Sequence, residues 1–483
     1  MTAFVGLDLG TSGLRALMIG RDGHVIASAE ASYDVQRPHA GWSEQDPAAW
    51  IIATRTVFAK LAAKADLTDI TGIAVAGHMH GATLLDSNGE VLRPCILWND
   101  TRSHAQAGRL DKVDGFRERT GNIVFPGFTA PKLLWVAEQE PEIFAQVAKV
   151  LLPKDYLTWW LTGTYSADMS DSAGTSWLDV GQRDWSEDLL AHTNLGREHM
   201  PSLYEGTAPV GKVTSERARE LGLSGDVCVA AGAGDNAAAA CGIGALREGD
   251  GFVSLGTSGV LLAAKDGFAP DAASAVHTFC HAVPDRWYQM GVILAATDSL
   301  NWLARTLGTS PSDLSREMGA EISGPGTVCF GPYLSGERTP HNDSGVRGAF
   351  VGLDIATDRS GLTQAVFEGV AFAMKQSHIA LKGTGTRIDR LFAIGGGAQS
   401  RYWVELLATV LDLPIDLPRQ GEFGAAMGAA RLAICAATGA APDDVMVPPE
   451  IARTIEPRTD LQPAYEDAFA TFEALYPALK ALP

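Results

Sequence analysis

The chain has 483 residues, enough for two or three domains, and 46% apolar with 20% charged residues is typical of an ordinary globular enzyme. Its formal net charge of −19 argues against a nucleic acid or an anionic membrane as partner, because both bind clustered lysine and arginine. We expect a negatively charged substrate to be held by local backbone N–H groups or by a metal ion.

Targeting and redox signals point to a cytoplasmic protein. The first residues, MTAFVGLDLG, lack the basic and long apolar regions of a signal peptide. No apolar run approaches the roughly 20 residues of a membrane span. The six cysteines show no CxxC spacing, so neither a zinc site nor a disulfide framework is indicated.

An internal repeat organises the chain. Residues 9–13 read LGTSG, and residues 255–259 read LGTSG again. Each copy lies between two short apolar segments, AFVGLD and LRALMI in the first half and GFVS and VLLAA in the second. An apolar run, a glycine-containing turn and a second apolar run predict a β-hairpin. The spacing of the copies favours a duplication into two similar domains.

Strand-like and helix-like segments alternate after the first hairpin, which predicts an α/β fold with helices packed on mixed sheets. A polar, glycine-rich segment, LREGDG at 246–251, divides the chain into domains 1–245 and 246–483. The predicted strands are HVIASAEASY (24–33), ITGIAVAG (70–77), VCVAAGAG (227–234) and RLFAIGGG (390–397), and the predicted helices lie at 236–246, 362–382, 400–411 and 464–482.

The two repeated turns are candidate phosphate sites. Glycine lets backbone N–H groups approach a phosphate closely, and the hydroxyls add donors. A single Gly-Thr-Ser turn is weak evidence because such turns are common in hairpins. Two copies, one per domain, could hold a polyphosphate from both sides of a cleft. The residues concerned are Gly10, Thr11 and Ser12 in the first copy and Gly256, Thr257 and Ser258 in the second.

An acid precedes only the first turn. Asp8 lies where a predicted strand runs into the turn, whereas Ser254 occupies the matching place in the second copy. A carboxylate there could hold Mg²⁺, directly or through water, as phosphoryl transfer requires. We therefore predict Asp8 as a metal ligand and a catalytic residue in a cleft that takes one nucleotide.

Several segments resemble a known family. DLGTSG, the repeated SLGTSG and GGGA at 395–398 are similar to the phosphate and adenosine motifs of the actin-like sugar kinases. FTAPKLLWVAEQ at 128–139, and GAFVGLD with AVFEG within 348–369, resemble the two signatures of the FGGY carbohydrate kinases. The resemblance implies two ribonuclease-H-like domains with a nucleotide and sugar cleft between them. It also implies ATP and Mg²⁺ as cofactors, and a homodimer.

Other segments narrow the substrate. GHMHGATLLD, LLPKDYL, GAGDNAAAACGIG and PYLSGERTPHN are similar to those of bacterial members that phosphorylate xylulose. The resemblance implies ATP-dependent conversion of D-xylulose to D-xylulose 5-phosphate, with another pentulose or a polyol such as ribulose or xylitol as the alternative. The chain departs from the pattern at His78, where similar proteins usually carry Gln, and at Gly361, and the literal string FGGY is absent.

The resemblance assigns the sugar site. Position alone makes Asp235, at the head of a predicted helix, an N-cap. The family pattern makes it the base that accepts the proton of the attacking sugar hydroxyl, with Asn236 able to bond another hydroxyl. Met79 and His80 follow a predicted strand, where a lone histidine is normally a hydrogen-bonded structural residue; the family pattern places both at the ketose.

The resemblance assigns the segment Gly395, Gly396, Gly397 and Ala398 to adenosine, and glycine backbone without Cβ atoms can lie against the base or ribose. A rival interpretation is a dinucleotide fingerprint whose third glycine is replaced by Ser400, with Asp416 at a suitable distance for the ribose. That alternative predicts an NAD-dependent dehydrogenase. A further alternative is a sensor that binds sugar or nucleotide without catalysis.

Some polar residues are left outside the predicted site. Trp98, Asn99 and Asp100 lie on the same side of the expected cleft, but structural packing explains them equally well. Glu337, Arg338 and Glu368 occur among apolar residues, and we interpret them as members of structural ion pairs.

Overall fold

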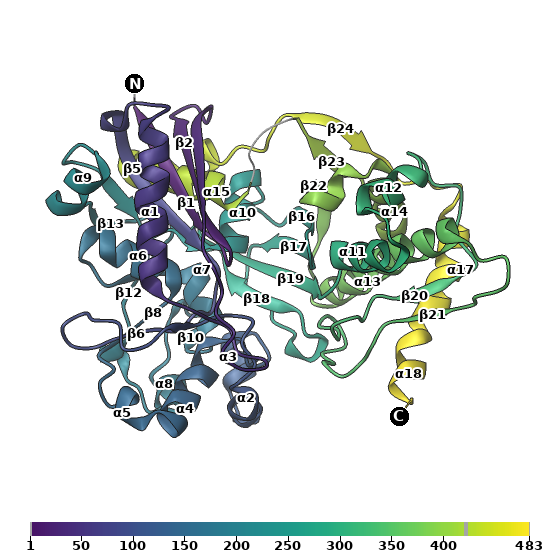
Figure 1. The fold of residues 1–483 in the computed structure, drawn as a ribbon, viewed down its shortest axis with the longest axis horizontal. Helices are drawn as coiled ribbons and strands as arrows, with labels where there is room; N and C mark the ends of the chain where they lie inside the picture. The colour runs from purple at the N-terminus through teal and green to yellow at the C-terminus, as the bar shows by residue number, and fades with distance from the viewer. Residues whose placement is uncertain (1, 420–423, 483) are drawn as a thin grey trace.

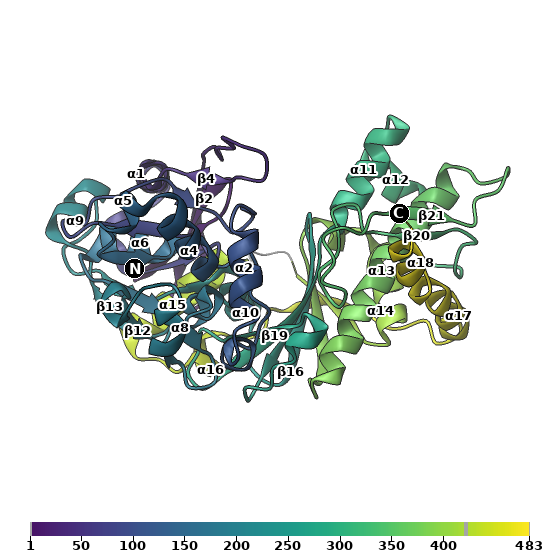
Figure 2. The same ribbon diagram turned by 90° about the horizontal axis from the view of Figure 1, so that it is seen from below.

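The computed structural model describes residues 2–419 and 424–482, and these form two lobes side by side (Figure 1). The first half of the sequence builds one lobe and most of the second half builds the other. Figure 2 shows that strands β16 (Gly249–Leu255) and β19 (Trp287–Ile293) of the second lobe face the first lobe. Its helices lie on the far side of those strands.

The first lobe is built on a seven-stranded sheet in the order β13–β14–β5–β1–β2–β3, with β15 alongside β5. Strands β1, β5, β14 and β15 are parallel, and β2, β3 and β13 run antiparallel to their neighbours. The strand bounds are β1 (Ala3–Leu9), β2 (Gly13–Gly20), β3 (Val25–Ser32), β5 (Ile70–Gly77), β13 (Pro209–Lys212), β14 (Cys228–Ala230) and β15 (Ala233–Gly234).

The second lobe has a sheet of the same plan. Its order is β18–β19–β17–β16–β22–β23–β24, with β16, β22 and β23 parallel and the other neighbours antiparallel. In each sheet a hairpin leads into a further antiparallel strand, and a parallel strand lies on the hairpin's other side. The duplication predicted from the sequence is therefore confirmed. The remaining strands are β17 (Gly259–Lys265), β18 (His277–Cys280), β22 (Ile388–Ile394), β23 (Ile415–Pro418) and β24 (Ile451–Ile455).

Short ladders and helices complete the first lobe. The paired short strands are β4 (Glu44–Gln45) with β7 (Cys95–Ile96), β6 (Thr83–Leu85) with β8 (Lys149–Leu151), β9 (Ser166–Asp168) with β12 (Ser202–Tyr204), and β10 (Leu178–Asp179) with β11 (Asp184–Trp185). The helices are α1 (Pro47–Ala62), α2 (His104–Leu110), α3 (Phe116–Thr120), α4 (Thr129–Gln139), α5 (Pro141–Phe144), α6 (Pro153–Thr162), α7 (Met169–Ser172), α8 (Glu187–Ala191), α9 (Ser215–Leu221) and α10 (Asp235–Ile243), with 3₁₀ turns at Leu67–Asp69, Ala173–Thr175 and Arg197–His199.

The second half supplies one further ladder, β20 (Cys329–Gly331) with β21 (Ala349–Val351), and the other helices. The predicted final helix is two helices, because the chain breaks at Ala474. Within the described residues, every helix is too short or too polar to cross a bilayer. The helices are α11 (Thr297–Leu307), α12 (Pro311–Glu317), α13 (Arg359–Gly383), α14 (Arg401–Leu411), α15 (Ala425–Thr438), α16 (Pro442–Val445), α17 (Gln462–Glu473) and α18 (Leu475–Lys480), with 3₁₀ turns η4 (Ala272–Ser274) and η5 (Gly396–Gln399).

Helix α15 belongs to the second half of the sequence but packs on the first sheet. It covers β1, β5 and β14 and crosses α10. Small residues allow the close approach: a Cβ on Gly6 of β1 would lie 1.9 Å from the carbonyl oxygen of Ala426, and one on Gly428 would lie 1.7 Å from that of Ala238. Helix α1 packs on the opposite side, against β2 and β3. The first sheet is thus completed by a helix that follows the second sheet's parallel strands.

Candidate active site

Three parallel strands of the first sheet end at one place. Ala76 of β5 pairs with Asp8 of β1 on one side and with Ala233 of β15 on the other. Met79 and His80 follow β5 directly, and Asp235 follows β15. Ligands of open α/β sheets bind beyond the carboxyl ends of the strands. The fold therefore gathers the predicted catalytic and sugar-binding residues at one edge of the sheet.

The two aspartates interact electrostatically. Burial, followed by the negative charge of Asp235, raises the pKa of Asp8 to about 7, while Arg15, opposite Asp8 on β2, acts to lower it. Burial raises the pKa of Asp235 to about 6, against hydrogen bonds from Asn236 that lower it. A cation placed beside Asp8 would relieve this repulsion.

Position alone favoured Asp235 as the N-cap of α10, but Gly234 holds that place, and Asp235 is the first helical residue. Its Oδ1 instead accepts hydrogen bonds from the Asn236 backbone N (2.7 Å) and from Asn236 Nδ2 (2.8 Å). Asn236 thus orients the carboxylate, and its own amide oxygen remains an acceptor.

His80 is held in an unusual conformation. Its φ of 71° is in the left-handed region, and its carbonyl oxygen accepts bonds from Lys132 Nζ (2.8 Å) and Thr129 Oγ1 (3.1 Å). The ring stacks on Phe128 with centroids 4.3 Å apart. Burial lowers the pKa of His80 to about 3, so the ring is neutral. Its Nδ1 lies 2.6 Å from the carbonyl oxygen of Gly174, an acceptor, so Nδ1 carries the proton and Nε2 is left as an acceptor.

The two residues before His80, His78 and Met79, are buried. Met79 is 4% exposed, and its Sδ accepts a bond from the hydroxyl of Tyr288, a residue of the second lobe. His78, the departure from the family pattern, is 3% exposed. Its Nδ1 donates to the carbonyl oxygen of Leu9 (2.9 Å), and its ring lies edge-on to Trp50. His78 therefore braces the end of β1.

The first phosphate turn presents its amides. The carbonyl oxygen of Gly10 accepts a bond from the Tyr33 hydroxyl (2.6 Å), and that of Thr11 accepts one from Gln45 Nε2 (2.6 Å). Among the described residues, the backbone amides of Thr11 and Ser12 donate to no protein acceptor. Because the carbonyl oxygens are hydrogen-bonded within the protein and the amides are free to donate, the turn can bind an anion.

The second phosphate turn has the same arrangement. Its carbonyl oxygens accept bonds from the start of α11: Gly256 from Thr297 N (2.9 Å) and Thr297 Oγ1 (2.8 Å), and Thr257 from Ala296 N (2.9 Å). Across the part of the chain that the structure describes, the amides of Gly256, Thr257 and Ser258 have no protein acceptor outside the hairpin ladder. Both repeats thus meet the same local requirement for phosphate.

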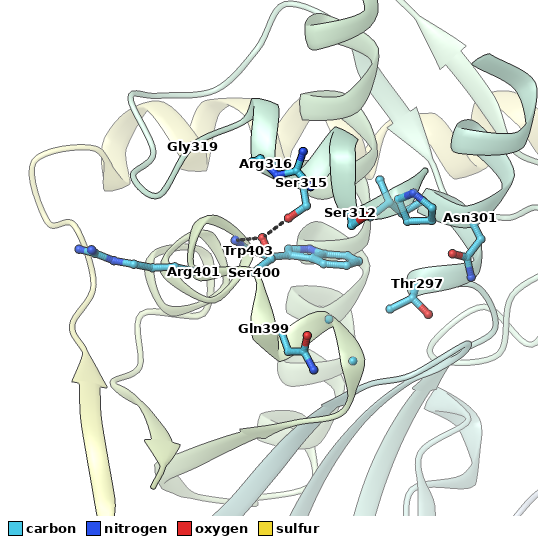
Figure 3. A pocket seen from close by; sticks show the side chains of 14 residues that line it. Thr297, Asn301, Ser312, Ser315, Arg316, Gly319, Gln399, Ser400, Arg401 and Trp403 are labelled. Atoms are coloured by element: carbon cyan, nitrogen blue, oxygen red, sulfur yellow. Dashed lines mark hydrogen bonds between the residues drawn. The ribbon is translucent and has the colours of Figure 1, made fainter. Parts of the chain in front are cut away.

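A cavity of about 680 Å³ lies beside the second turn. Gly396 and Gly397 of η5 line it, and a Cβ on Gly396 would meet nothing within 4 Å, so this backbone faces open space. Figure 3 shows the side chains of Thr297, Asn301 and Gln399 bordering the same space. Gly395 and Ala398, also predicted for adenosine, lie outside its lining: Gly395 has a φ of 86° and packs on Leu255. The rival interpretation of this segment as a dinucleotide fingerprint is wrong. Such a fingerprint opens a half of a doubly wound parallel sheet, whereas β22 lies next to the antiparallel hairpin of β16 and β17.

A larger cavity, of about 820 Å³, lies between the lobes. Trp98 and Asn99 line it from the first lobe and Glu337 and Arg338 from the second. The guanidinium of Arg338 lies over Phe125, with Cζ 4.9 Å from the ring centroid. The predicted ion pairs are wrong: within residues 2–419 and 424–482, Glu337, Arg338 and Glu368 join none. Glu337 instead accepts backbone bonds from Leu294 and Arg338.

Trp98 and Arg338, which the sequence analysis left outside the predicted site, both line this cavity. Trp98 donates to Thr11 Oγ1 across 87 residues of chain, and Arg338 reaches the cavity only because the second lobe faces the first. A large aromatic residue in the polar segment RPCILWNDTRS was the one local signal available for Trp98.

Comparison with known proteins places this geometry in a family. The model of the FGGY family of carbohydrate kinases, N-terminal domain, matches residues 3–242, and that of the C-terminal domain matches residues 251–437. The chain is 44% identical over 486 residues to the xylulose kinase of Escherichia coli (strain K12), with 99% of each sequence covered. A crystal structure of a xyloylose kinase from Brucella ovis superimposes with a TM-score of 0.98 at 56% identity over all of both chains. That of xylulose kinase from Rhodospirillum rubrum gives 0.91 at 31% identity over 99% of both.

The chain belongs to the FGGY family of carbohydrate kinases. It is a sugar kinase, a phosphotransferase whose substrates are ATP and a sugar, and its two-lobed α/β fold is that of the family.

Proposed function

We propose that this kinase transfers the γ-phosphoryl group of ATP to the 5-hydroxyl of D-xylulose, giving D-xylulose 5-phosphate. The observation that carries the choice of sugar is the identity to the xylulose kinases of E. coli (44% over 99% of the chain) and Klebsiella pneumoniae (46% over 89%). The substrate class that these relatives indicate is a pentose, whose phosphorylated product enters carbohydrate metabolism.

Asp235 is the base of the reaction. Its carboxylate, ionised above a pKa of about 6, accepts the proton of the attacking hydroxyl as the oxygen approaches the γ-phosphorus. Because phosphoryl-transfer transition states are loose, the carboxylate mainly orients the hydroxyl and takes the proton late. Its hydrogen bonds to Asn236 restrict the directions from which it can act.

The ketose lies against the edge formed by β1, β5 and β15. His80 offers Nε2 as an acceptor to a sugar hydroxyl, because its Nδ1 proton is already engaged by Gly174. Asn236 offers its amide oxygen. Met79 contributes through its backbone, since its thioether packs under Gly234 and against Tyr288.

The nucleotide lies between the two turns. The open amides of Thr11 and Ser12 bind phosphate from the first lobe, and those of Gly256, Thr257 and Ser258 bind it from the second. Adenosine occupies the cavity beside Gly396 and Gly397. A chain of net charge −19 can hold a polyphosphate in this way because the binding groups are local dipoles.

Asp8 is the residue that would hold the Mg²⁺ that accompanies ATP. Carboxylate oxygen is the donor that Mg²⁺ prefers, and the raised pKa of Asp8 reflects burial and repulsion that a cation offsets. The ion supplies charge neutralisation at the transferring phosphate. The proposed division of labour assigns residues 1–245 to sugar binding and the base, and residues 246–483 to adenosine, with α15 returning to the first sheet.

The test is ADP release with MgATP against D-xylulose, D-ribulose, xylitol, glycerol and hexuloses. Strong turnover with D-xylulose alone supports the proposal, whereas preference for another acceptor keeps the kinase and changes the sugar. Asp235→Ala is expected to lower sugar-dependent turnover at least about a hundredfold while ATP still binds. Near-normal turnover in that variant would refute Asp235 as the base.

A further inference from the structure

A buried network of polar side chains leads to Asp235, and the reaction as described does not use it. Lys154 of α6 is fully buried, and its Nζ pairs with Asp168 Oδ1 at 2.8 Å and also with Asp155. Burial lowers the pKa of Lys154, but the carboxylates of Asp155, Asp168 and Asp171 outweigh burial and leave that pKa raised. Lys154 is therefore a charged ammonium inside the lobe.

A series of hydrogen bonds runs from this ion pair to the residue that precedes the base. Asp168 Oδ2 accepts bonds from the Ser170 hydroxyl and from the Ser170 backbone N (2.7 Å). The same hydroxyl oxygen accepts a bond from the backbone N of Gly234 at 3.1 Å. Gly234 is the residue immediately before Asp235 and the N-cap of α10. In each of these hydrogen bonds an N–H or O–H donor meets an oxygen acceptor.

The same lysine also holds the other end of the turn that carries the base. Lys154 Nζ donates to the carbonyl oxygen of Ala231 at 3.3 Å. Between Ala231 and Gly234 the chain passes through Gly232, which has a φ of 83° and where a Cβ would lie 2.0 Å from the carbonyl oxygen of Val75. The turn therefore has one fixed entry and one fixed exit, both defined by Lys154 and its partners.

We propose that Lys154, Asp168 and Ser170 form a positioning network that sets the place of the Asp235 carboxylate at the sugar hydroxyl. Displacing a reacting group by about 1 Å can cost about a hundredfold in rate, so a turn held at both ends has a direct kinetic value. This inference rests on the proposed role of Asp235 as the base, and none of the three residues touches substrate.

The chain offers a matched control. Ser170 and Ser172 lie on the same short helix, both fully buried, but the hydroxyl of Ser172 has no hydrogen-bond partner among the described residues. Ser170→Ala removes the link to Gly234, whereas Ser172→Ala removes an equal volume and no link. We expect Ser170→Ala to lower kcat about tenfold, the effect of one lost hydrogen bond to a positioned group, and to leave the KM for ATP unchanged. Ser172→Ala keeps kcat within twofold of the parent.

A double-mutant cycle separates positioning from general structural damage. If Ser170 acts through Asp235, Ser170→Ala causes no further loss of turnover in an Asp235→Asn background. An equal tenfold loss in both backgrounds, or a kcat for Ser170→Ala within twofold of the parent, would overturn the proposal. Ser170→Cys, close in shape but a weak hydrogen-bonding group, gives the same direction if the alanine variant folds poorly.

A second measurement does not depend on turnover. Amide hydrogen exchange over residues 231–236 is expected to be slow in the parent and in Ser172→Ala, and at least tenfold faster in Ser170→Ala. Unchanged exchange in Ser170→Ala would refute the network even if kcat fell. If the parent protein showed no sugar-dependent ADP release, the proposed function would fail, and the exchange result would still decide whether Ser170 holds the turn.

Discussion

The indole Nε1 of Trp98 donates a hydrogen bond of 3.0 Å to the hydroxyl of Thr11. Trp98 follows β7 and is 40% exposed, with its ring on the wall of the interlobe cavity. Thr11 is the central residue of the first phosphate turn. One side chain therefore contacts the turn proposed to bind phosphate and also lines the cavity of about 820 Å³ between the lobes. Its hydrogen bond restricts the rotation of the Thr11 hydroxyl.

Trp98→Phe keeps an aromatic ring and removes the donor. We expect the KM for MgATP to rise about fivefold, because a neutral hydrogen bond contributes about 1 kcal/mol. Initial rates at varied MgATP and saturating ketose measure the effect. Trp160→Phe is the control, since Trp160 stacks with Arg55 and Arg217 on the surface of α6. An unchanged KM in Trp98→Phe would show that the hydroxyl of Thr11 is not needed in this orientation.

The pH dependence follows from the base. Asp235 acts as an acceptor only when ionised, and its pKa is raised to about 6, so protonation on lowering the pH removes the active form. We expect kcat/KM for the ketose to fall about tenfold per pH unit below about 6 and to level off above it. The profile is measured at saturating MgATP, with circular dichroism to confirm folding at each pH. A profile that stays flat down to pH 4.5 would contradict the assignment.

Gly396 faces open space in the cavity assigned to adenosine. Gly396→Val places a branched side chain there without a backbone penalty of the left-handed kind, since Gly396 has no positive φ. We expect the Kd for a fluorescent ATP analogue to rise about tenfold or more, because bound atoms and the new methyl groups would compete for the same volume. Gly383→Val is the control, at the end of α13 and likewise with nothing near its Cβ position. Equal affinity in the two variants would place adenosine elsewhere.

Two glycines in helices predict opposite effects on stability. Gly428→Ala in α15 forces a Cβ against the carbonyl oxygen of Ala238, and we expect it to lower the free energy of unfolding by about 3 kcal/mol or more. Gly108→Ala in α2 meets nothing within 4 Å, and helix propensity predicts a gain of about 1 kcal/mol. Chemical denaturation midpoints of the two variants measure both. Similar midpoints would mean that α10 and α15 can move apart without cost.

The fold could be predicted where the signal is local. Apolar runs on either side of a glycine turn predict the hairpins around Gly10 and Gly256. The repeated pentapeptide predicts two domains of similar plan. The docking of α15 could not be predicted. Its sequence, AAMGAARLAICAAT, is apolar on most sides, so periodicity does not say which surface it covers. Part of that surface, strand β1, lies more than 400 residues earlier in the chain.

In the site, too, features with a local sequence signal could be predicted, and features that depend on distant contacts could not. The place of Asp8 at the end of β1, before the first phosphate turn, could be predicted from the sequence, and its proposed role stays a prediction. Position alone gave Asp235 as an N-cap, which is wrong because Gly234 occupies that place, and only family resemblance indicated a base. Ser170 and Trp98 act through partners 64 and 87 residues away, and no local pattern encodes such contacts.

The return of α15 to the first sheet has a consequence for biosynthesis. One face of β1, β5 and β14 keeps its apolar side chains uncovered at least until residue 438 has been synthesised, when about nine-tenths of the chain exists. A truncation at residue 245 would leave that face open to water, so such a fragment should need α15 supplied as a separate peptide to become soluble. We therefore expect the nascent first half to be prone to aggregation until α15 has been made.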